Sequence, residues 1–425
     1  MTRKGVWDIQ DVRDKLLSGD PWLRYNAMYT SGVNVYGELG QGNQDGSGEG
    51  AKFAQVDSQE DFSQVGGCDE ASFGVTADGK LMCMGNNPGG VLGLNQPTSS
   101  RYSSPTQVPG TTWASTCMSH TGSMMGAKTD GTAWFWGRSP SSVPQGRLRG
   151  VAGYPANQSC SSPVQIPGTS YVANPSRTDQ QKFMFTERAG YLIDGDDKLY
   201  SWGFQQWGEL GQNQGGDVSS AVAYKTQVGT DTTWKWVSGY TGPTQVSCAS
   251  AVKTDGTLWA LGGAGGPDGC MGLGNNKTDI SSPTQVGANT NWASISGANM
   301  GDKGGFCAMK DDGTLWVWGM TGTGTLGLNQ TNVSISSPYS VPGGPWKFGQ
   351  VCENTMIRLK ADDTLWISGD VRAAGMQGET GHQLISSPVQ VPSATVGFSS
   401  EMGIWGASGY LNCGVISPNL TPAQV

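Results

Sequence analysis

The stretch TDGTAWFWG, at residues 129–137, decides the fold, because it returns almost unchanged as TDGTLWALG at 254–262 and as DDGTLWVWG at 311–319. Asp-Gly between two apolar runs is the strongest short-range signal for a two-residue β-hairpin turn. The apolar run after the turn, Leu-Trp-Val-Trp in the third copy, is too short for a helix and is rich in strand-forming residues. Each copy therefore predicts one antiparallel hairpin.

Weaker copies of the same phrase extend the pattern along the chain. They end at Gly85, Gly203 and Gly369, while a partial copy ends at Gly37 and a degenerate one at Gly414. From Gly37 to Gly369, the closing glycines of successive copies lie 48 to 66 residues apart. Repeats of ~40–50 residues are typical of propeller blades, so this period predicts a β-propeller.

Two further phrases accompany each hairpin. A Gly-x-Leu-Gly loop follows it, as at residues 37–40, 90–93, 208–211 and 324–327, and a Ser-Ser-Pro-x-Gln-Val phrase comes next, as at 103–108 and 161–166. Proline fits an outer edge strand, where its missing N–H costs nothing. An aromatic residue then opens the next strand, which gives four strands per unit. The Gly-x-Gly-x-x-Gly at 322–327 matches the dinucleotide fingerprint by chance, because no βαβ unit surrounds it.

Together these phrases resemble the repeats of the regulator-of-chromosome-condensation family, over roughly residues 30–425. The resemblance implies an all-β, seven-bladed β-propeller of four-stranded antiparallel blades, closed by strands from both ends of the chain; eight blades are the alternative. Seven full units are expected to start near Phe62, Trp113, Tyr171, Trp234, Trp292, Trp346 and Val396. A strand phrase near 33–36 or near 422–425 is expected to complete the closing blade. The family's nucleotide exchange and chromatin docking are not implied, since this chain has no basic tail.

The composition suits many short strands and disfavours several kinds of partner. The chain has 66 glycines in 425 residues, and 14% of its residues are charged, against ~25% in typical globular proteins. The net charge of −8 disfavours nucleic acid, because an acidic surface repels phosphates. No apolar stretch approaches the ~20 residues that span a bilayer, and no secretory signal follows the first residues. The nine cysteines are scattered, without a Cys-x-x-Cys pair, and are expected to be buried thiols.

Residues 1–25 break the repeat pattern and are expected to form a short N-terminal helical arm, with the propeller domain over 26–425. Trp7, Ile9, Val12 and Leu16 are expected to form an apolar face that anchors the arm in an assembly. Docking of this face on the chain's own propeller is the alternative. The Lys-Gly-Val-Trp-Asp opening resembles structural proteins of marine tailed phages, which implies a virion component made in the host cytoplasm.

Residues suited to catalysis or metal binding are sparse. The two histidines, His120 and His382, fall in different repeats, which disfavours a zinc or general-base site. The acidic run at 194–197 occupies a hairpin turn and lacks the remaining ligands of a calcium loop. No Gly-x-Ser-x-Gly elbow occurs. We therefore expect no catalytic residues, no cofactor and no metal.

A long insertion is the remaining candidate for binding. Residues 138–160 interrupt the third repeat and form the most basic part of the chain, with Arg138, Arg147, Arg149 and Tyr154 as candidate contact residues. The alternative is that the insertion has no role in binding. The sequence favours a non-enzymatic structural or assembly protein of a phage virion, in contact with other virion proteins or copies of itself. The second hypothesis is a soluble protein-binding propeller that acts as an inhibitor or adaptor, and the third is an enzyme.

Overall fold

The computed structural model describes residues 26–44, 51–68, 70–118, 122–138, 159–168, 171, 182–186, 189–205, 207–214, 222–241, 247–262, 269–274, 279–297, 305–352, 354–370, 384–391, 402–405 and 412–418.

Nearly all the regular structure in this part of the chain is β-strand. In chain order the strands are β1 (Asn26–Gly32), β2 (Ala51–Gln55), β3 (Phe62–Cys68), β4 (Ala71–Thr76), β5 (Leu81–Asn86), β6 (Arg101–Gln107), β7 (Trp113–Met118), β8 (Ser123–Lys128), β9 (Ala133–Gly137), β10 (Cys160–Ile166), β11 (Phe183–Phe185), β12 (Ala189–Ile193), β13 (Leu199–Gly203), β14 (Val222–Gln227), β15 (Trp234–Thr241), β16 (Ser247–Lys253), β17 (Leu258–Gly262), β18 (Ile280–Gln285), β19 (Trp292–Gly297), β20 (Gly305–Lys310), β21 (Leu315–Thr321), β22 (Val333–Ser340), β23 (Trp346–Cys352), β24 (Thr355–Lys360), β25 (Leu365–Asp370), β26 (Leu384–Gln390), β27 (Met402–Trp405) and β28 (Asn412–Pro418). A 3-10 turn, η2 (Pro88–Gly90), follows β5.

The recurring phrase forms the predicted hairpin turn, and its side chains explain its composition. In the turn between β20 and β21, Asp312 Oδ1 accepts bonds from the backbone N–H of Thr314 at 2.9 Å and from its hydroxyl at 2.6 Å. The Thr314 hydroxyl in turn accepts a bond from Trp316 Nε1 at 2.9 Å. Gly313 takes φ +77°, a left-handed conformation that favours glycine. The Asp-Gly-Thr-x-Trp phrase is therefore one hydrogen-bonded unit that joins the turn to the next strand.

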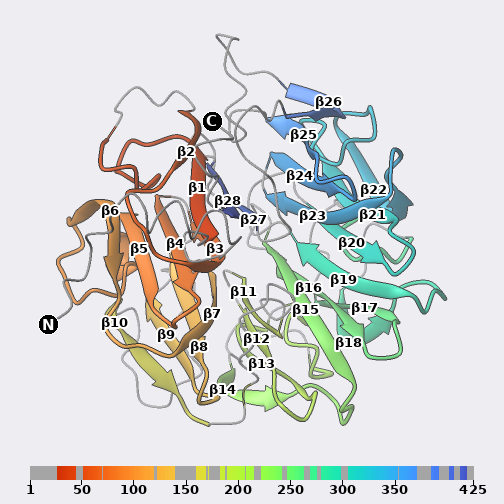
Figure 1. Cartoon of the computed structure of the whole chain (residues 1–425). Helices are drawn as coiled ribbons and strands as arrows, with labels where there is room; N and C mark the ends of the chain where they lie inside the picture. The colour runs from red at the N-terminus through yellow and green to blue at the C-terminus, as the bar shows by residue number, and fades with distance from the viewer. Residues whose placement is uncertain are drawn as a thin grey trace, which may run out of the picture.

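Six blades are each built from four consecutive antiparallel strands: β3–β6, β7–β10, β11–β14, β15–β18, β19–β22 and β23–β26. The sheets stand around a common centre, with the first strand of each nearest to it (Figure 1). The ring is closed by a composite four-stranded sheet of order β2-β1-β28-β27, in which β1 and β28 pair antiparallel from Asn26 opposite Pro418 to Gly32 opposite Asn412. Inner strand β27 contacts β3, so the ends of the chain complete the circle.

The number of blades in the predicted fold class is corrected. Six blades, and not the predicted seven, are each formed by one complete repeat. The segment near Val396 was expected to supply a full unit, but it contributes only β27 and β28, and the composite sheet takes its other two strands from the N-terminal end. The closing strand is Asn26–Gly32 and not residues 33–36, which belong to the loop after it. Tyr171 does not open a strand either, since the first strand of its blade is Phe183–Phe185.

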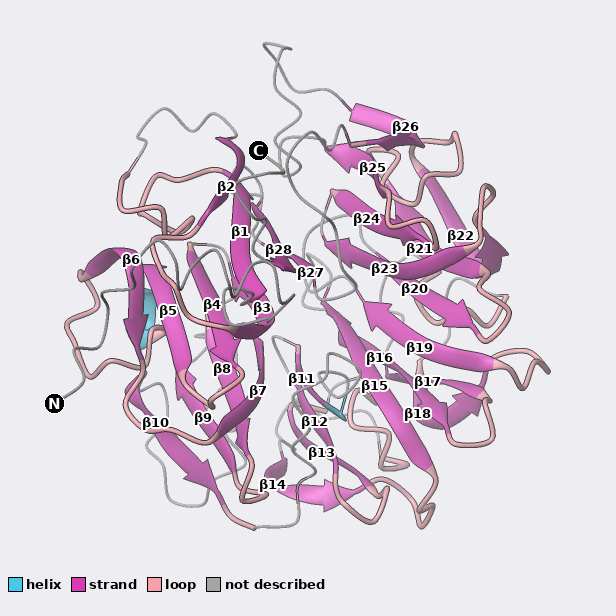
Figure 2. Ribbon diagram, in the orientation of Figure 1, coloured by secondary structure: helices cyan, strands magenta, loops and turns pink. Residues whose placement is uncertain are grey.

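The predicted helical arm is the second correction to the fold class. The described residues contain no α-helix, and strands and loops make up almost everything that Figure 2 colours. The predicted arm, residues 1–25, lies outside the described residues, as do Trp7, Ile9, Val12 and Leu16. No helix in the described part of the chain is long and apolar enough to cross a membrane.

The core lies between neighbouring sheets, where large aromatic side chains interlock. Phe135 meets Phe185 edge to face at 5.4 Å between ring centroids, and Phe185 meets Trp202 in the same way at 5.9 Å. Tyr240 and Phe306 bridge the next pair of blades at 6.4 Å. Edge-to-face aromatic pairs add about 0.5–1.5 kcal/mol beyond the area that they bury. Repeated contacts of this kind pack neighbouring sheets against one another around the ring.

Candidate functional site

The structure describes one of the four predicted contact residues, Arg138. Arg138 is exposed at the end of β9, where its backbone N–H donates to the carbonyl of Gly122 at 2.9 Å and its carbonyl accepts from the Ser123 hydroxyl at 2.7 Å. Arg147, Arg149 and Tyr154 lie outside the described residues, so the structure does not bring the predicted cluster together. His120 and His382 also fall outside them.

The two edges of the ring differ in the connections that they carry. In each up-and-down blade, the turns of the repeated phrase join the second and third strands at one end of the blade. We call this end of the ring the turn rim. The connections between the third and fourth strands lie at the other edge, which we call the loop rim. The insertion that begins at Arg138 joins β9 to β10, so it belongs to the loop rim.

The Gly-x-Leu-Gly loops bind the Ser-Ser-Pro strands of the next blade. In the blade β19–β22, a Cβ on Gly324 would lie 2.5 Å from Ser386 Cα of β26, so only glycine fits. Asn329 N–H then donates to the carbonyl of Ser386 at 2.7 Å. The same backbone bond recurs around the ring at 2.6–2.8 Å, from Gly42 to Ser103, Asn95 to Ser161, Asn213 to Ser281 and Gly274 to Ser336. The Gly-x-Leu-Gly loops and the Ser-Ser-Pro strands are therefore the contacts that hold neighbouring blades together.

Side chains of the following blade bind carbonyls inside the same loops. Trp136 Nε1 donates to the carbonyl of Val91 at 2.8 Å, and Trp318 Nε1 donates to that of Cys270 at 3.0 Å. In the blade β23–β26 a fully buried arginine, Arg358, takes this role and donates to the carbonyl of Leu326 at 2.9 Å. Burial lowers the pKa of the Arg358 guanidinium to about 9. These buried polar groups form hydrogen bonds between neighbouring blades.

A buried carboxyl group lies in the closing part of the ring. Glu38, in the first Gly-x-Leu-Gly loop, accepts bonds from the backbone N–H groups of Tyr36 at 2.6 Å and Val35 at 3.2 Å. Burial is the main cause that raises the pKa of Glu38 from 4.5 to about 7, and the charge of Glu70 adds to it. A buried acid of raised pKa is a candidate for catalysis. Here both oxygens bond to the turn of its own loop, which indicates a structural role.

Lysine side chains cover pairs of aromatic rings at the turn rim. Lys253 Nζ lies 4.7 Å from the Trp234 ring and 3.9 Å from the Trp259 ring, and it also pairs with Asp231 at 2.7 Å. The same arrangement recurs around Lys128, Lys310 and Lys360, each over two tryptophans. A cation over an aromatic ring contributes about 0.5–2 kcal/mol, depending on how far it is desolvated.

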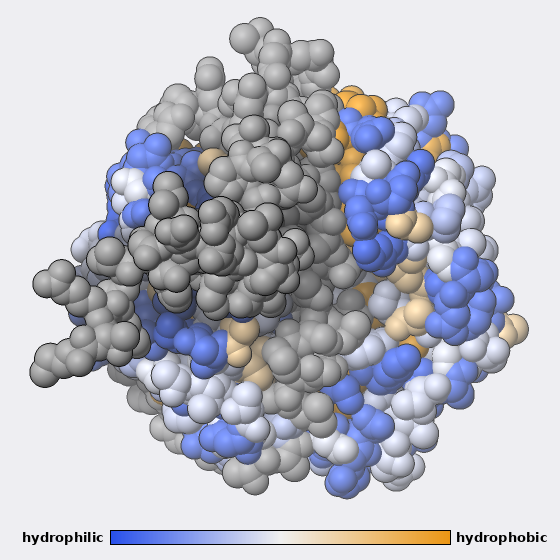
Figure 3. Space-filling view, viewed as in Figure 1, coloured by the Kyte–Doolittle hydropathy of each residue, from blue (hydrophilic) through white to orange (hydrophobic). Residues whose placement is uncertain are grey.

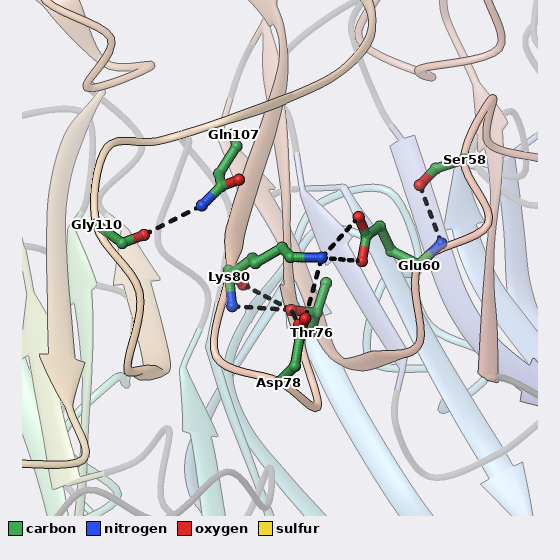
Figure 4. Close-up of polar contacts among 7 residues, drawn as sticks. All are labelled: Ser58, Glu60, Thr76, Asp78, Lys80, Gln107 and Gly110. Atoms are coloured by element: carbon green, nitrogen blue, oxygen red, sulfur yellow. Dashed lines mark hydrogen bonds and ion pairs between the residues drawn. The ribbon is translucent and has the colours of Figure 1, made fainter. Parts of the chain in front are cut away.

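The blade β3–β6 replaces this arrangement by an ion pair. Phe62 and Met82 stand where four other blades have tryptophans, and Lys80 pairs with Glu60 at 2.8 Å and Asp78 at 3.0 Å (Figure 4). The hydrogen bonds to Glu60 and Asp78 raise the pKa of Lys80. The lysines of the turn rim are thus already engaged within their own blades.

In the described part of the chain, the large apolar side chains that are exposed lie on outer strands of two neighbouring blades. Leu384 is 54% exposed, Val333 is 39% exposed and Tyr339 is 59% exposed. Leu384 opens β26 and Val333 opens β22, so both lie at the loop rim. Apolar surface appears over β25 and β26 in the space-filling view, among hydrophilic surroundings (Figure 3). In the described part of the chain, no group of three or more histidine, cysteine or acidic side chains could hold a metal ion.

Comparisons with known proteins identify the fold and no closer relationship. No protein-family model and no curated protein matches the sequence. The chain is similar in structure to human WBSCR16, with a TM-score of 0.70 at 12% identity over 94% of this chain and 100% of that one. It is also similar to the structure of Kap60 bound to yeast RCC1 (Prp20), with a TM-score of 0.69 at 11% identity over 100% of this chain and 96% of that one.

A further solved structure, Prp20p from Saccharomyces cerevisiae, gives a TM-score of 0.68 at 12% identity over 95% of this chain and 93% of that one. The fold of this chain is therefore that of the RCC1-like β-propellers, as the repeat phrases predicted. At these identities the likeness shows the fold alone. The resemblance of residues 1–22 to phage structural proteins receives no support from these structures and stays a prediction.

Proposed function

We propose that this chain is a non-enzymatic propeller that binds a protein partner through its loop rim. The observation that carries the proposal is the exposure of Val333 and Leu384 on adjacent outer strands. Exposed apolar groups that gather at one place on a rigid protein are typical of contact surfaces. The catalytic residues that the sequence could offer are few, and buried polar side chains such as Arg358 and Trp318 hydrogen-bond to the neighbouring blade.

The two apolar residues belong to one edge of the ring. Asn329 N–H bonds to Ser386 at 2.7 Å, which fixes the loop before β22 against the start of β26. Val333 follows that asparagine by four residues, and Leu384 precedes that serine by two. The strands themselves, VSISSPYS and LISSPVQ, contain no charged residue. Proline within each edge strand disfavours the addition of a further strand, so a partner would contact side chains.

Solved propellers of this fold also support a protein partner. Yeast RCC1 (Prp20) is described in a complex with Kap60, and Prp20p is described with binding properties to Gsp1p and histones. The net charge of this chain, −8, favours a partner with basic groups at its contact surface.

A structural role in a phage particle is the more specific form of the proposal. It rests on the wording of residues 1–22, which lie outside the described residues, and it makes the partner another virion protein or a second copy of this chain. The loop rim proposal does not depend on it.

Site-specific photo-crosslinking tests the proposed contact surface. A benzophenone amino acid is placed at Leu384, at Val333 or, as a matched control, at Gln107, which is exposed on outer strand β6 at the turn rim. We expect the same partner to be cross-linked from Leu384 and Val333 and not from Gln107, with its identity given by mass spectrometry. A virion protein would support the more specific form, and any other protein would leave an adaptor or inhibitor. Cross-links that are absent, or equal from all three positions, would reject the loop rim as the contact surface.

A further inference from the structure

A surface cavity of about 360 Å³ lies between the blades β15–β18 and β19–β22. Its walls come from Gln285 at the end of β18, from Asn289 in the connection to β19, and from Trp316 and Pro338 of the next blade. This volume is within the ~300–1,000 Å³ of typical small-molecule sites, toward the small end. The cavity takes no part in the proposed contact at the loop rim.

One wall of the cavity is a fixed aromatic surface. Trp292 and Trp316 meet edge to face at 5.8 Å with 76° between their planes. Lys310 Nζ lies 4.7 Å from the first ring and 4.0 Å from the second, while Thr314 holds Trp316 Nε1 at 2.9 Å. Trp316 is partly exposed. Its ring is therefore held in one orientation before any ligand arrives, which lowers the entropy cost of binding.

The lining of this cavity includes one buried tryptophan. Trp292 is 2% exposed, and its Nε1 has no hydrogen-bond partner among the described residues. The Nε1 atoms of Trp113, Trp234 and Trp346 are unpaired in the same way, so this donor is a feature of the repeat. The connection beside Trp292 is open, since a Cβ on Gly287 would meet nothing within 4 Å. A ligand would therefore contact the exposed groups of the lining.

The remaining lining identifies the chemistry of the ligand. Gln285, Asn289 and Ser337 add exposed amide and hydroxyl groups, and the described lining contains no charged side chain. A sugar ring has an apolar C–H face that stacks on indole, and hydroxyl groups that pair with amides. We propose that this cavity binds a neutral saccharide, with the ring against Trp316 and hydroxyl groups on the amides of Gln285 and Asn289.

A proline-rich peptide is the competing ligand, because proline also stacks on tryptophan. Such a peptide is extended at ~3.1 Å per residue and needs a long groove. The compact cavity favours a single sugar unit, and amide groups on two sides suit a ligand with several hydroxyls.

Glycan-array binding of the full chain tests the proposal. The fluorescently labelled protein is applied to an array of neutral mono- to tetrasaccharides, and the strongest sugar is titrated by calorimetry. The Gln285→Ala/Asn289→Ala variant is compared with Gln107→Ala, which removes the corresponding exposed glutamine of another blade. We expect the double variant to bind at least tenfold more weakly and the control to bind as the parent does.

Three results would overturn the saccharide site. The first is an array without any signal from protein whose circular dichroism shows an intact fold. The second is a sugar that binds equally to parent and double variant. The third is binding of a proline-rich peptide, used as a second probe, that the double variant loses while no sugar binds. Each of these outcomes leaves the loop-rim proposal untouched, because no residue of the cavity takes part in it.

Discussion

Replacing Gly324 by alanine tests whether the Gly-x-Leu-Gly loops hold the blades together. Gly324 has φ +80°, and a Cβ there would lie 2.5 Å from Ser386 Cα in the next blade. The left-handed conformation costs a non-glycine residue about 1–2 kcal/mol. Forcing an extra carbon against a packed backbone adds about 1–3 kcal/mol. We therefore expect Gly324→Ala to lower the free energy of unfolding by about 2–5 kcal/mol.

Gly229→Ala is the matched control, because the two costs can be separated there. Gly229 has φ +63°, but a Cβ on it would meet nothing within 4 Å. This control should lose only the conformational cost of about 1–2 kcal/mol. Urea unfolding of both variants, followed by tryptophan fluorescence, gives the two midpoints. Equal losses would refute the reasoning, since the contact with Ser386 would then contribute nothing.

Three further predictions concern buried or bonded groups. Burial raises the pKa of Glu38 from 4.5 to about 7. The stabilisation that its protonated form contributes is therefore fully present below about pH 4.5 and is lost as the pH rises to about 7. The urea midpoint of the parent should fall across this window, and that of Glu38→Gln should fall less. Thr257→Val removes the hydroxyl that links Trp259 Nε1 and Asp255 at 2.7 Å each, and should cost about 1–2 kcal/mol by urea unfolding; a loss below 0.3 kcal/mol, within the ordinary spread of surface substitutions (~±0.5 kcal/mol), would contradict the role of that bond. Burial raises the pKa of the Cys83 thiol, so maleimide should label it only after unfolding, as peptide mapping can show, and labelling of the native protein at this residue would count against the packing.

The hairpins could be predicted from the sequence, because their information is local. Asp312, Gly313 and Thr314 form the turn with bonds that span two residues, and Trp316 joins them from the next strand. Four copies of the phrase contain the same unit, so a period of hairpins is visible without knowledge of the ring. The outer strands were predicted for the same reason, from proline before a Gln-Val pair.

The closure of the ring could not be placed from the sequence alone. Strand β1 pairs with β28, almost the whole length of the chain away, and NAMYTSG contains no repeat phrase that marks it as a strand. The contact of Gly324 with Ser386 was not predicted either, because the Gly-x-Leu-Gly loop and the Ser-Ser-Pro strand that form it belong to different blades. Their joint recurrence was the signal that could have revealed this contact. Arg358 gave no signal at all, since an arginine in a strand is ordinarily expected to reach solvent.

The measurement that tests the central claim most directly is the affinity of the cross-linked partner for the ring. Val333→Ser/Leu384→Ser removes the two exposed apolar side chains from the loop rim and should leave the unfolding midpoint unchanged. Truncation of a hot-spot residue costs about 2 kcal/mol or more, so calorimetry should show binding weakened by tenfold or more. The control Gln107→Ala should bind as the parent does. Unchanged affinity in the double variant would contradict the proposal that this propeller binds protein through its loop rim.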